Sequence, residues 1–558
     1  MLKTLLPTLL LSLLPLCGAA HSLATDRPHH HSEAGWLNHR QQQGPTTAKS
    51  LTIGIWNKAG NVSTYTIGNP RNDWILHLVL DKLREPSPYI GNAANWLASE
   101  VRQVSDDART WEISLREGVR WHDGTELTAD DVVFTFEYYR DGPANRWTHH
   151  ASMVPRLEKV EKLGPYKLRV SAAKPMPNFD TNTAPELPIM QKKQWQNVDK
   201  PRTFRDLLIG TGPYKLVDYK ADEYYRLKAN EDYWNGKPTV DEITLVMIRD
   251  IQTLFTALKT GEIDGANRSL PPELMQQWLQ DENLKIARAP DMWGVWLDLN
   301  LGRKPFDQRD LRRAISLAID PQPMLDTIML GQAQSGNLGW PHVDSVWTDD
   351  SLDNPHDQEA AASLLEKLGF VDRDKDGYRE QTDGSPLDWS LKVSSNQPLQ
   401  FRAAEMVVKQ LAEVGLKAHI DTLDPASFAA LWGNGQFDLR LMDITPHGIA
   451  DQDMLTVLYQ IDNKKALHNE QDKAAIMQEW YQASTREARE QASHRLQQYQ
   501  NRYPNRIMLW YPDGLFAYRW KRFDNYASAD GYGIFHKYSF LERASRKGVA
   551  TELNTPEN

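Results

Sequence analysis

The most telling run of residues in this chain is Leu115-Arg116-Glu117-Gly118-Val119-Arg120-Trp121-His122-Asp123-Gly124, followed shortly by Leu127-Thr128-Ala129-Asp130-Asp131-Val132. His122-Asp123 looks like an acid–base pair, but Gly124 directly after it indicates a turn. Trp111 and Trp121 are expected to pack in a core. Residues 130–139 carry apolar side chains bracketed by charge, so they fit a helix and a strand equally well. The run therefore predicts packed structure rather than a catalytic pair.

Strand and helix patterns alternate on both sides of this run. Residues 51–55 are an apolar stretch typical of a strand, and residues 168–172 and 243–247 alternate apolar with polar positions. Residues 254–258 favour a helix that Gly261 stops.

The clearest helix is predicted to begin with Asp307 as its cap and to stop at Pro321. One of its faces is apolar, and three arginines are expected to lie off that face: Arg309, Arg312 and Arg313. A second helix, over 403–414, precedes a strand over 417–421. Helices and strands interleaved in this way predict an α/β fold with parallel or mixed sheets.

Length, charge and hydropathy exclude several classes of protein. At roughly 150 residues per domain, 558 residues predict two to four domains. The chain has 64 Lys and Arg against 74 Asp and Glu, a net charge of −10, so we expect no nucleic-acid partner. A mean hydropathy of −0.60, without any long apolar run, excludes a multi-pass membrane protein.

Residues 1–24 are typical of a secretory signal peptide, with Lys3 before an apolar run and small residues after it. Cys17, the only cysteine, lies in this segment, so the mature chain is expected to hold no disulfide. A lipid anchor at Cys17 is the less favoured alternative, since Leu16 stands where a lipobox requires a small residue. Residues 25–50 are predicted to be a flexible His-rich segment, the alternative being metal binding by His29, His30 and His31.

Several motifs occur in the order typical of one known family. The block at 96–137 is followed by Gly210-Thr211-Gly212-Pro213-Tyr214, Tyr233-Trp234-Asn235-Gly236-Lys237-Pro238, Leu258-Lys259-Thr260-Gly261-Glu262-Ile263-Asp264, Pro305-Phe306-Asp307 and Gly331-Gln332-Ala333. In this order they resemble the bacterial family 5 solute-binding proteins, the peptide/nickel class that serves ABC importers. The resemblance covers about residues 50–520.

The resemblance implies an α/β, two-lobed periplasmic binding protein of type II (Venus-flytrap) with an extra inserted domain. Strands near 293–300 and 507–519 are expected to cross between the lobes. The expected division is 1–24 for the signal peptide, 25–50 for the flexible segment, 51–90 and 205–300 for lobe I, 91–204 for the extra domain, 301–515 for lobe II, and 516–558 for the return to lobe I and the tail.

The same resemblance implies the function. The expected protein is a periplasmic monomer that captures an oligopeptide between two closing lobes and delivers it to an ABC permease in the inner membrane. No catalysis is expected and no cofactor is required. An oligosaccharide, an opine or a metal chelate is the alternative ligand.

Eight residues are predicted to face the ligand from segments that should border the cleft. Tryptophan rings there can stack on sugars or accept apolar side chains. The eight are Trp56, Asn57, Trp293, Trp296, Trp340, Asp443, His447 and Asp451.

The anchor for a peptide α-amine decides between the two main ligand classes. Peptide-binding relatives carry an Asp soon after the equivalent of Phe437-Asp438, and that Asp pairs with the amine. Here His447 stands near that position, so Asp443 and Asp451 are the acids available. His447-Gly448 with Ala450-Asp451 is similar to the oligosaccharide-binding branch of the family. Peptide and oligosaccharide therefore both stay open.

A calcium-loop pattern lies between a predicted helix at 360–368 and a predicted strand at 387–393. Such loops place oxygen ligands at positions 1, 3, 5 and 12 and a glycine at position 6. Gly377 supplies that glycine, and the oxygen ligands would come from Asp372, Asp374, Asp376 and Asp383. A structural calcium ion is one interpretation, and a solvated acidic turn is the other.

Two short motifs match a penicillin-recognising hydrolase, a distant alternative. Ser171-Ala172-Ala173-Lys174 fits Ser-x-x-Lys, and Lys259-Thr260-Gly261 fits Lys-Thr-Gly. The middle element should lie between them, whereas Ser105-Asp106-Asp107 precedes both. We therefore predict that the chain is not an enzyme. A periplasmic chaperone is the third class, and it would take many unrelated segments instead of one small ligand.

Overall fold

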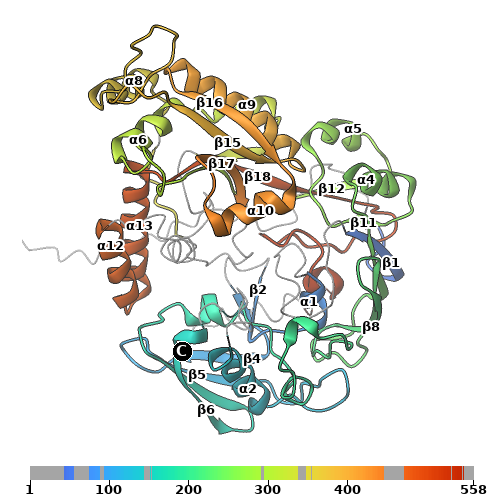
Figure 1. Ribbon diagram of the computed structural model, residues 1–558. Coiled ribbons are helices and arrows are strands. Elements are labelled where there is room, and N and C mark those ends of the chain that lie inside the picture. The colour runs from blue at the N-terminus through green and yellow to red at the C-terminus, as the bar shows by residue number, and fades with distance from the viewer. Residues whose placement is uncertain are drawn as a thin grey trace, which may run out of the picture.

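The computed structural model describes residues 43–55, 74–87, 93–143, 151, 154–290, 294–336, 347–353, 355–444, 471–529, 531–542 and 545. They form two α/β lobes and a third domain (Figure 1). Within these ranges, no helix has the length and apolar character needed to cross a bilayer.

Lobe I is built on strands β1 (Ala48–Ile55), β8 (Tyr214–Lys220), β9 (Tyr224–Ala229), β10 (Val240–Met247), β11 (Gly265–Ala266) and β12 (Lys285–Pro290). β1 runs parallel to both β10 and β11 and lies between them. The predicted strands at 51–55 and 243–247 are confirmed, and they are direct neighbours. Helices α1 (Trp74–Val79), α4 (Ile251–Thr260) and α5 (Met275–Leu279) complete this lobe.

Local residues explain where helix α4 begins and ends. The Asp250 side chain accepts a hydrogen bond from Thr253 N at 2.8 Å and caps the first turn. Gly261 ends the helix with φ of 89°, a left-handed conformation that glycine adopts without a steric penalty. The helix predicted from residues 254–258 and its stop at Gly261 are therefore confirmed.

Lobe II is built on strands β13 (Gly294–Leu299), β14 (Ala333–Ser335), β15 (Asp388–Ser394), β16 (Lys417–Leu423) and β17 (Leu439–Ile444). Its helices are α6 (Arg309–Ala318), α7 (Gln322–Thr327), α8 (Gln358–Lys367), α9 (Pro398–Glu413), α10 (Pro425–Asn434), α12 (Gln471–Gln482) and α13 (Arg486–Arg502). The strand predicted at 417–421 is confirmed as β16, which runs parallel to β15. The second predicted helix is confirmed as α9.

Two predictions for helix α6 are wrong. The helix begins one residue later than expected, with Gln308 rather than Asp307 at the cap position. Arg312 is fully buried instead of lying off the apolar face. Its guanidinium donates to Pro504 O at 2.9 Å and to Phe306 O at 3.0 Å. Buried backbone carbonyls need donors, and this arginine supplies them from within the core.

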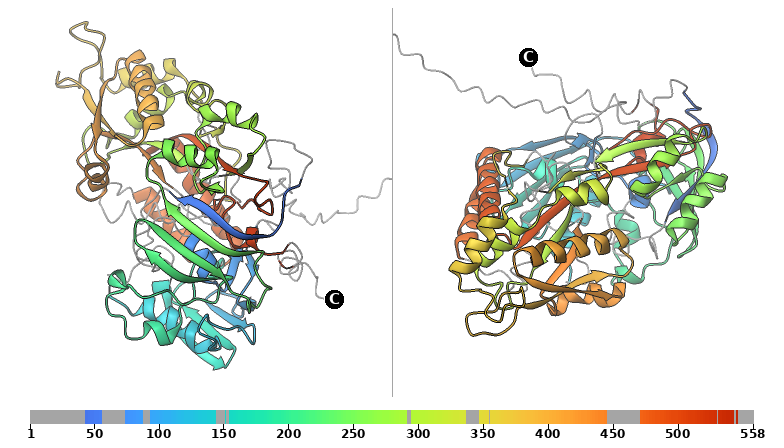
Figure 2. Two further views of the ribbon diagram at one scale, coloured as in Figure 1. Left: turned by 90° about the vertical axis from the view of Figure 1, so that its right-hand side faces the viewer. Right: turned by 90° about the horizontal axis from the view of Figure 1, so that it is seen from above.

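Strand β18 (Arg506–Tyr518) joins the two lobes. Its first residues pair with β13, and its later residues pair with β12 and β11. The larger sheet therefore runs through both lobes in the order β16-β15-β17-β13-β18-β11-β1-β10-β9-β8, with β12 and β14 also paired to β18. Figure 2 (left) shows the strands of lobe I between lobe II above and the third domain below.

The third domain, called the inserted domain below, is a four-stranded antiparallel sheet with helices α2 (Ala129–Arg140) and α3 (Lys192–Trp195). Its strands, in the order β4-β5-β7-β6, are β4 (Ala98–Gln103), β5 (Thr110–Leu115), β7 (Lys167–Ala172) and β6 (Leu157–Gly164). The ambiguous residues 130–139 are helical because Thr128 and Asp131 form a capping box. Trp111 and Trp121 are buried, as predicted. A short hairpin of β2 (Arg84–Pro86) and β3 (Ala93–Asn95) precedes this domain.

His122 fastens the inserted domain to lobe I. Its Nε2 lies 3.0 Å from Gly212 O, and its Nδ1 accepts a hydrogen bond from Gly210 N at 3.2 Å. These contacts require a neutral ring, and burial lowers the pKa of His122 to about 4. A side chain at Gly210 would come within 1.7 Å of Val79 O, so only glycine permits this close approach. His122 is thus a structural residue, and the predicted turn is confirmed.

A second junction connects the inserted domain to helices α12 and α13 of lobe II (Figure 1, left side). Arg489 is fully buried and donates to Asn178 Oδ1 at 2.6 Å and to Pro175 O at 2.9 Å. Its guanidinium lies 4.1 Å from the ring centroid of Trp480. The mouth contact, as we call it, consists of Arg156, Lys174, Pro175, Asn178, Trp480, Tyr481 and Arg489.

Candidate ligand-binding site

A cavity of about 260 Å³ lies where the two lobes meet. On the lobe II side, Asp443 on β17 pairs with Val295 on β13, and Val295 pairs with Trp510 on β18. All three line the cavity. Because directly paired residues on adjacent strands face the same side of a sheet, their side chains form one continuous wall.

The opposite wall belongs to lobe I and follows strand β11 directly. Residues 267–273 line the cavity, and their backbone is tied to two strands. Asn267 N donates to Gly54 O at 2.9 Å, and Leu270 N donates to Leu515 O at 2.7 Å. Ser269 Oγ accepts from Leu515 N at 3.0 Å. This wall is therefore held in place by the sheet itself.

Polar and apolar groups complete the lining. The start of helix α9 contributes Gln397, Pro398, Leu399 and Gln400, and other segments contribute Ile251, Gln252, Met329, Pro512, Phe516 and Tyr532. A mostly apolar lining with a few polar groups is typical of cavities that bind small ligands.

Among the described lining residues, four are charged: Arg268, Glu273, Asp443 and Asp513. Asp513 forms an ion pair of 2.8 Å with Arg288, which compensates its charge. Arg268 and Glu273 belong to lobe I, and Asp443 belongs to lobe II. Lobe I thus presents charges of both signs to the cavity, and lobe II presents a negative one.

Behind Tyr532 lies a buried network of charges in lobe I. The ring of His77 meets the ring of Tyr532 edge-on, with centroids 4.6 Å apart. Lys537 Nζ donates to Asp81 and to Glu85, at 2.5 Å each. Burial alone would raise the pKa of Glu85, but the nearby cations, Lys537 foremost, lower it to about 2. This network lies directly behind Tyr532, a residue of the cavity wall.

One predicted ligand residue, Trp296, is placed wrongly by the sequence analysis. It is fully buried and packs with Met442, Trp480 and Met508 in a core on the other face of the sheet. Successive residues of a strand point to opposite faces, so Val295 reaches the cavity and Trp296 cannot.

The other predicted ligand residues divide into two groups. Asp443 lines the cavity. Trp56, Asn57, Trp293, Trp340, His447 and Asp451 lie outside the described residues, as do the predicted signal peptide and the His29–His31 tract.

The sequence analysis missed Trp510 and Arg268. Trp510 lies on the strand that was expected to cross between the lobes, and its pairing with Val295 identifies the face on which it lies. Arg268 follows the Leu258–Asp264 motif by four residues, and no local pattern marks it as a binding residue.

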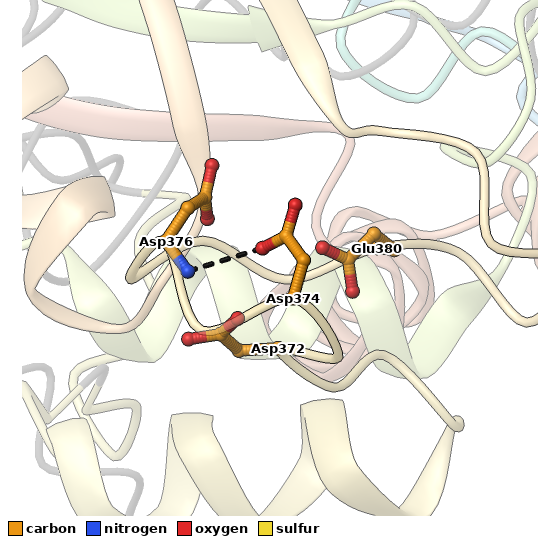
Figure 3. A group of neighbouring side chains, drawn as sticks. All are labelled: Asp372, Asp374, Asp376 and Glu380. Atoms are coloured by element: carbon orange, nitrogen blue, oxygen red, sulfur yellow. Dashed lines mark hydrogen bonds between the residues drawn. The ribbon is translucent and has the colours of Figure 1, made fainter.

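The predicted calcium loop is only partly assembled as expected (Figure 3). Oxygen atoms of Asp372, Asp374, Asp376 and Glu380 lie within 4.8 Å of one another. Asp383 is not in this group, because its carboxylate accepts from Ser385 N at 2.9 Å and from Ser385 Oγ at 2.7 Å in a separate turn. Backbone amides also occupy the cluster, as in the bond from Lys375 N to Asp372 at 2.7 Å. Calcium binding stays a prediction, with Glu380 in the place of Asp383.

The hydrolase motifs fall on separate structural units. Ser171 lies on β7 of the inserted domain, and Lys259 to Gly261 form the end of α4 in lobe I. The Lys174 ammonium lies 5.0 Å from the ring centroid of Tyr481 in the mouth contact. These elements belong to two different domains. Each motif is therefore part of its local structure, and the two motifs are not two parts of one hydrolase site.

A cavity between two α/β lobes joined by a shared strand defines a two-lobed binding protein. The chain belongs to the bacterial extracellular solute-binding proteins of family 5, whose sequence model matches residues 92–466. This confirms the family and the fold expected from the motifs.

Two known proteins illustrate the similarity. The oligopeptide-binding protein AppA of Bacillus subtilis is 26% identical over 398 residues, which is 69% of each chain. The crystal structure of AppA with a nonapeptide aligns with a TM-score of 0.70 at 21% identity, covering 88% of this chain and 99% of AppA. NikZ of Campylobacter jejuni, solved with Ni(L-His), aligns with a TM-score of 0.73 at 23% identity, covering 87% of this chain and 98% of NikZ.

Proposed function

We propose that this chain is the substrate-binding subunit of an ABC importer and that its ligand is a peptide. The observation that carries the proposal is the carboxylate of Asp443 on the wall of an inter-lobe cavity, beside the apolar side chains of Val295 and Trp510. A carboxylate in such a cavity favours a cationic group, and a peptide carries one at its amino terminus.

The relatives support this choice of ligand class. AppA of Bacillus subtilis is named as an oligopeptide-binding protein, and its solved structure holds a nonapeptide. The nickel–histidine complex of NikZ belongs to a chain of the same fold, so fold alone does not select the ligand. The choice of peptide therefore depends on the chemistry of the cavity.

Closure of the lobes provides the transport signal. A ligand that contacts both walls binds the closed form better than the open form and shifts the population toward it. The permease then distinguishes the loaded protein by its shape. We place the protein in the periplasm, exported by residues 1–24, and expect the purified exported chain to begin after that segment.

Calorimetric titration of the purified chain with peptides tests the proposal. A free peptide should bind, and N-acetylation of the same peptide should weaken binding about 10- to 100-fold, because a charged hydrogen-bond partner is lost. Asp443→Asn should lower the affinity for the free peptide by a similar factor and leave the affinity for the acetylated peptide almost unchanged. Asp206→Asn, an exposed aspartate in the same chain, is the matched control and should change neither.

The alternative ligands are separate outcomes of the same titration. If oligosaccharides bound and peptides did not, the proposed ligand class would be wrong and the proposed role in transport would stand. Binding of many unrelated unfolded segments at several sites per chain would favour a chaperone and contradict the proposal.

A further inference from the structure

The first turn of helix α9, at the wall of the cavity, has backbone donors without acceptors. Gln397 stands at the cap position and its side chain makes no capping bond, and Pro398 follows it. Phe401 N is the first amide of the helix to bond back, to Gln397 O at 3.0 Å. No described residue accepts a hydrogen bond from Leu399 N or Gln400 N. Two such N–H groups at the start of a 16-residue helix, together with its dipole, favour a negatively charged group.

Two buried polar side chains on the same wall also have no partner. Gln400 is 4% exposed and Trp510 is 2% exposed, and both line the cavity. Within the described part of the chain, neither the Gln400 amide nor the Trp510 indole N–H makes a hydrogen bond. Buried polar groups are nearly always paired, so these donors at a ligand cavity point to an acceptor that the ligand supplies.

Strand register places this turn beside Asp443. Strand β15 runs parallel to β17, with Leu391 opposite Leu439. Four residues further along both strands, Asp443 is level with Ser395, just before the turn. Adjacent strands lie about 4.8 Å apart, and parallel strands end at the same edge of a sheet. A peptide whose amine lies at Asp443 therefore brings its first two side chains within reach of the start of α9.

We propose that the start of helix α9, with Gln400 and Trp510, binds the carboxylate of an acidic side chain in the first or second residue of the peptide. This inference rests on the proposed function, which assigns the amino terminus to Asp443. The backbone amides, the Gln400 side chain and the Trp510 indole all supply N–H donors, and the two oxygens of a carboxylate can accept from several donors at once. A neutral amide side chain has one acceptor oxygen, so glutamine is bound less well than glutamate.

Calorimetry on the intact chain tests this with two pairs of free-acid tripeptides, Glu-Ala-Ala with Gln-Ala-Ala and Ala-Glu-Ala with Ala-Gln-Ala. The two members of a pair have the same termini, so contacts with the termini cancel in the comparison. In at least one pair, the glutamate peptide should bind the wild-type protein about tenfold more tightly.

Two variants of one residue locate the effect, and a third is the control. Gln400→Glu should abolish or reverse the preference, and an acid in the first turn suits the helix dipole, so the helix should still form. Gln400→Met keeps the backbone amides and should retain part of the preference. Gln491→Glu adds the same charge at an exposed glutamine of helix α13 and should change nothing.

The outcomes separate this inference from the proposed function. If both pairs bind the wild-type chain but glutamate and glutamine peptides bind alike, only the inference is overturned, and no variant is needed to see it. A preference that Gln400→Glu leaves intact would also overturn it. If Gln400→Glu weakens trialanine but not trialanine amide, the turn binds the terminal carboxylate and the side-chain assignment is wrong. If neither these peptides nor trialanine bind, the proposed function fails as well.

Discussion

Among the described residues, two junctions of lobe II with the rest of the molecule differ in kind. At β18 the connection is a continuous backbone with paired strands on both sides. At the mouth contact it consists of side chains from α12 and α13 against the inserted domain. A continuous strand can bend without separating, whereas a contact made by side chains can separate, and we expect the mouth contact to do so. The difference indicates that opening begins at the mouth contact and that the β18 region acts as the hinge.

Arg489→Met should give the largest effect, because it removes both donors from the mouth contact. Asn178 Oδ1 and Pro175 O would lose the donor that they have in this structure, which costs about 4 kcal/mol for the two groups together. Peptide affinity should fall by up to about 1,000-fold, and X-ray scattering should show a larger radius of gyration. Arg495→Met, an exposed arginine of the same helix paired with Glu479, is the control. Unchanged affinity with lowered stability would mean that this junction never opens.

His122→Asn tests the opposite junction of the inserted domain, its attachment to lobe I. With its pKa lowered from 6.5 to about 4, His122 stays neutral when folded but binds a proton below pH 6.5 when unfolded. Its contribution to stability is therefore complete above pH 6.5 and declines as the pH falls toward 4, by about 3 kcal/mol in total. We expect the free energy of unfolding, measured with urea from pH 7 to pH 4, to lose this pH-dependent part in His122→Asn. The control His419→Asn replaces an exposed histidine and should keep it. Identical pH profiles would contradict the assignment.

Gly514→Ala strains the hinge itself. A Cβ at this position would lie 2.6 Å from Ala289 O and 2.7 Å from the ring of Phe516. We expect a loss of about 1–3 kcal/mol in the free energy of unfolding, with little change in the ratio of open to closed forms. Gly164→Ala meets no atom within 4 Å and should cost nothing. A shift in scattering without a loss of stability would reverse the assignment of hinge and mouth.

Calcium should give the smallest effect, since the acidic loop of lobe II belongs to neither junction. If the loop binds calcium as predicted, millimolar calcium should raise the stability by about 1 kcal/mol without altering peptide affinity. Asp372→Asn should abolish the increase, and Asp383→Asn should not, because its carboxylate lies outside the cluster. If both variants lost the increase, Asp383 would be restored as a calcium ligand.

Much of the fold could be predicted because ordered motifs and local periodicity agree. The strand at 51–55, the helix end at Gly261 and the turn at Gly124 depend on nearby residues, and the structure has all three. Arg312 could not be predicted in this way, since its burial depends on carbonyls such as Pro504 O, almost two hundred residues away in sequence.

The site was harder to predict for a different physical reason. An aromatic residue in a crossing strand has two faces available, and the choice between Val295 and Trp296 is decided by register with β17. Register follows from pairing across 148 residues between Val295 and Asp443 and leaves no local signal. Asp443 was expected at the cavity because the family resemblance requires an acid soon after Phe437-Asp438, and it lines the cavity.

The late position of β18 in the chain bears on the export that we propose. Neither lobe can complete its sheet until residues 506–518 have been made, and Lys537 must follow before the acids at 81 and 85 are neutralised. A nascent chain of this topology stays without its central strand for most of its synthesis, because the contacts that complete it are remote in sequence. Slow folding keeps the polypeptide unfolded for longer, and a secretion channel requires an unfolded chain.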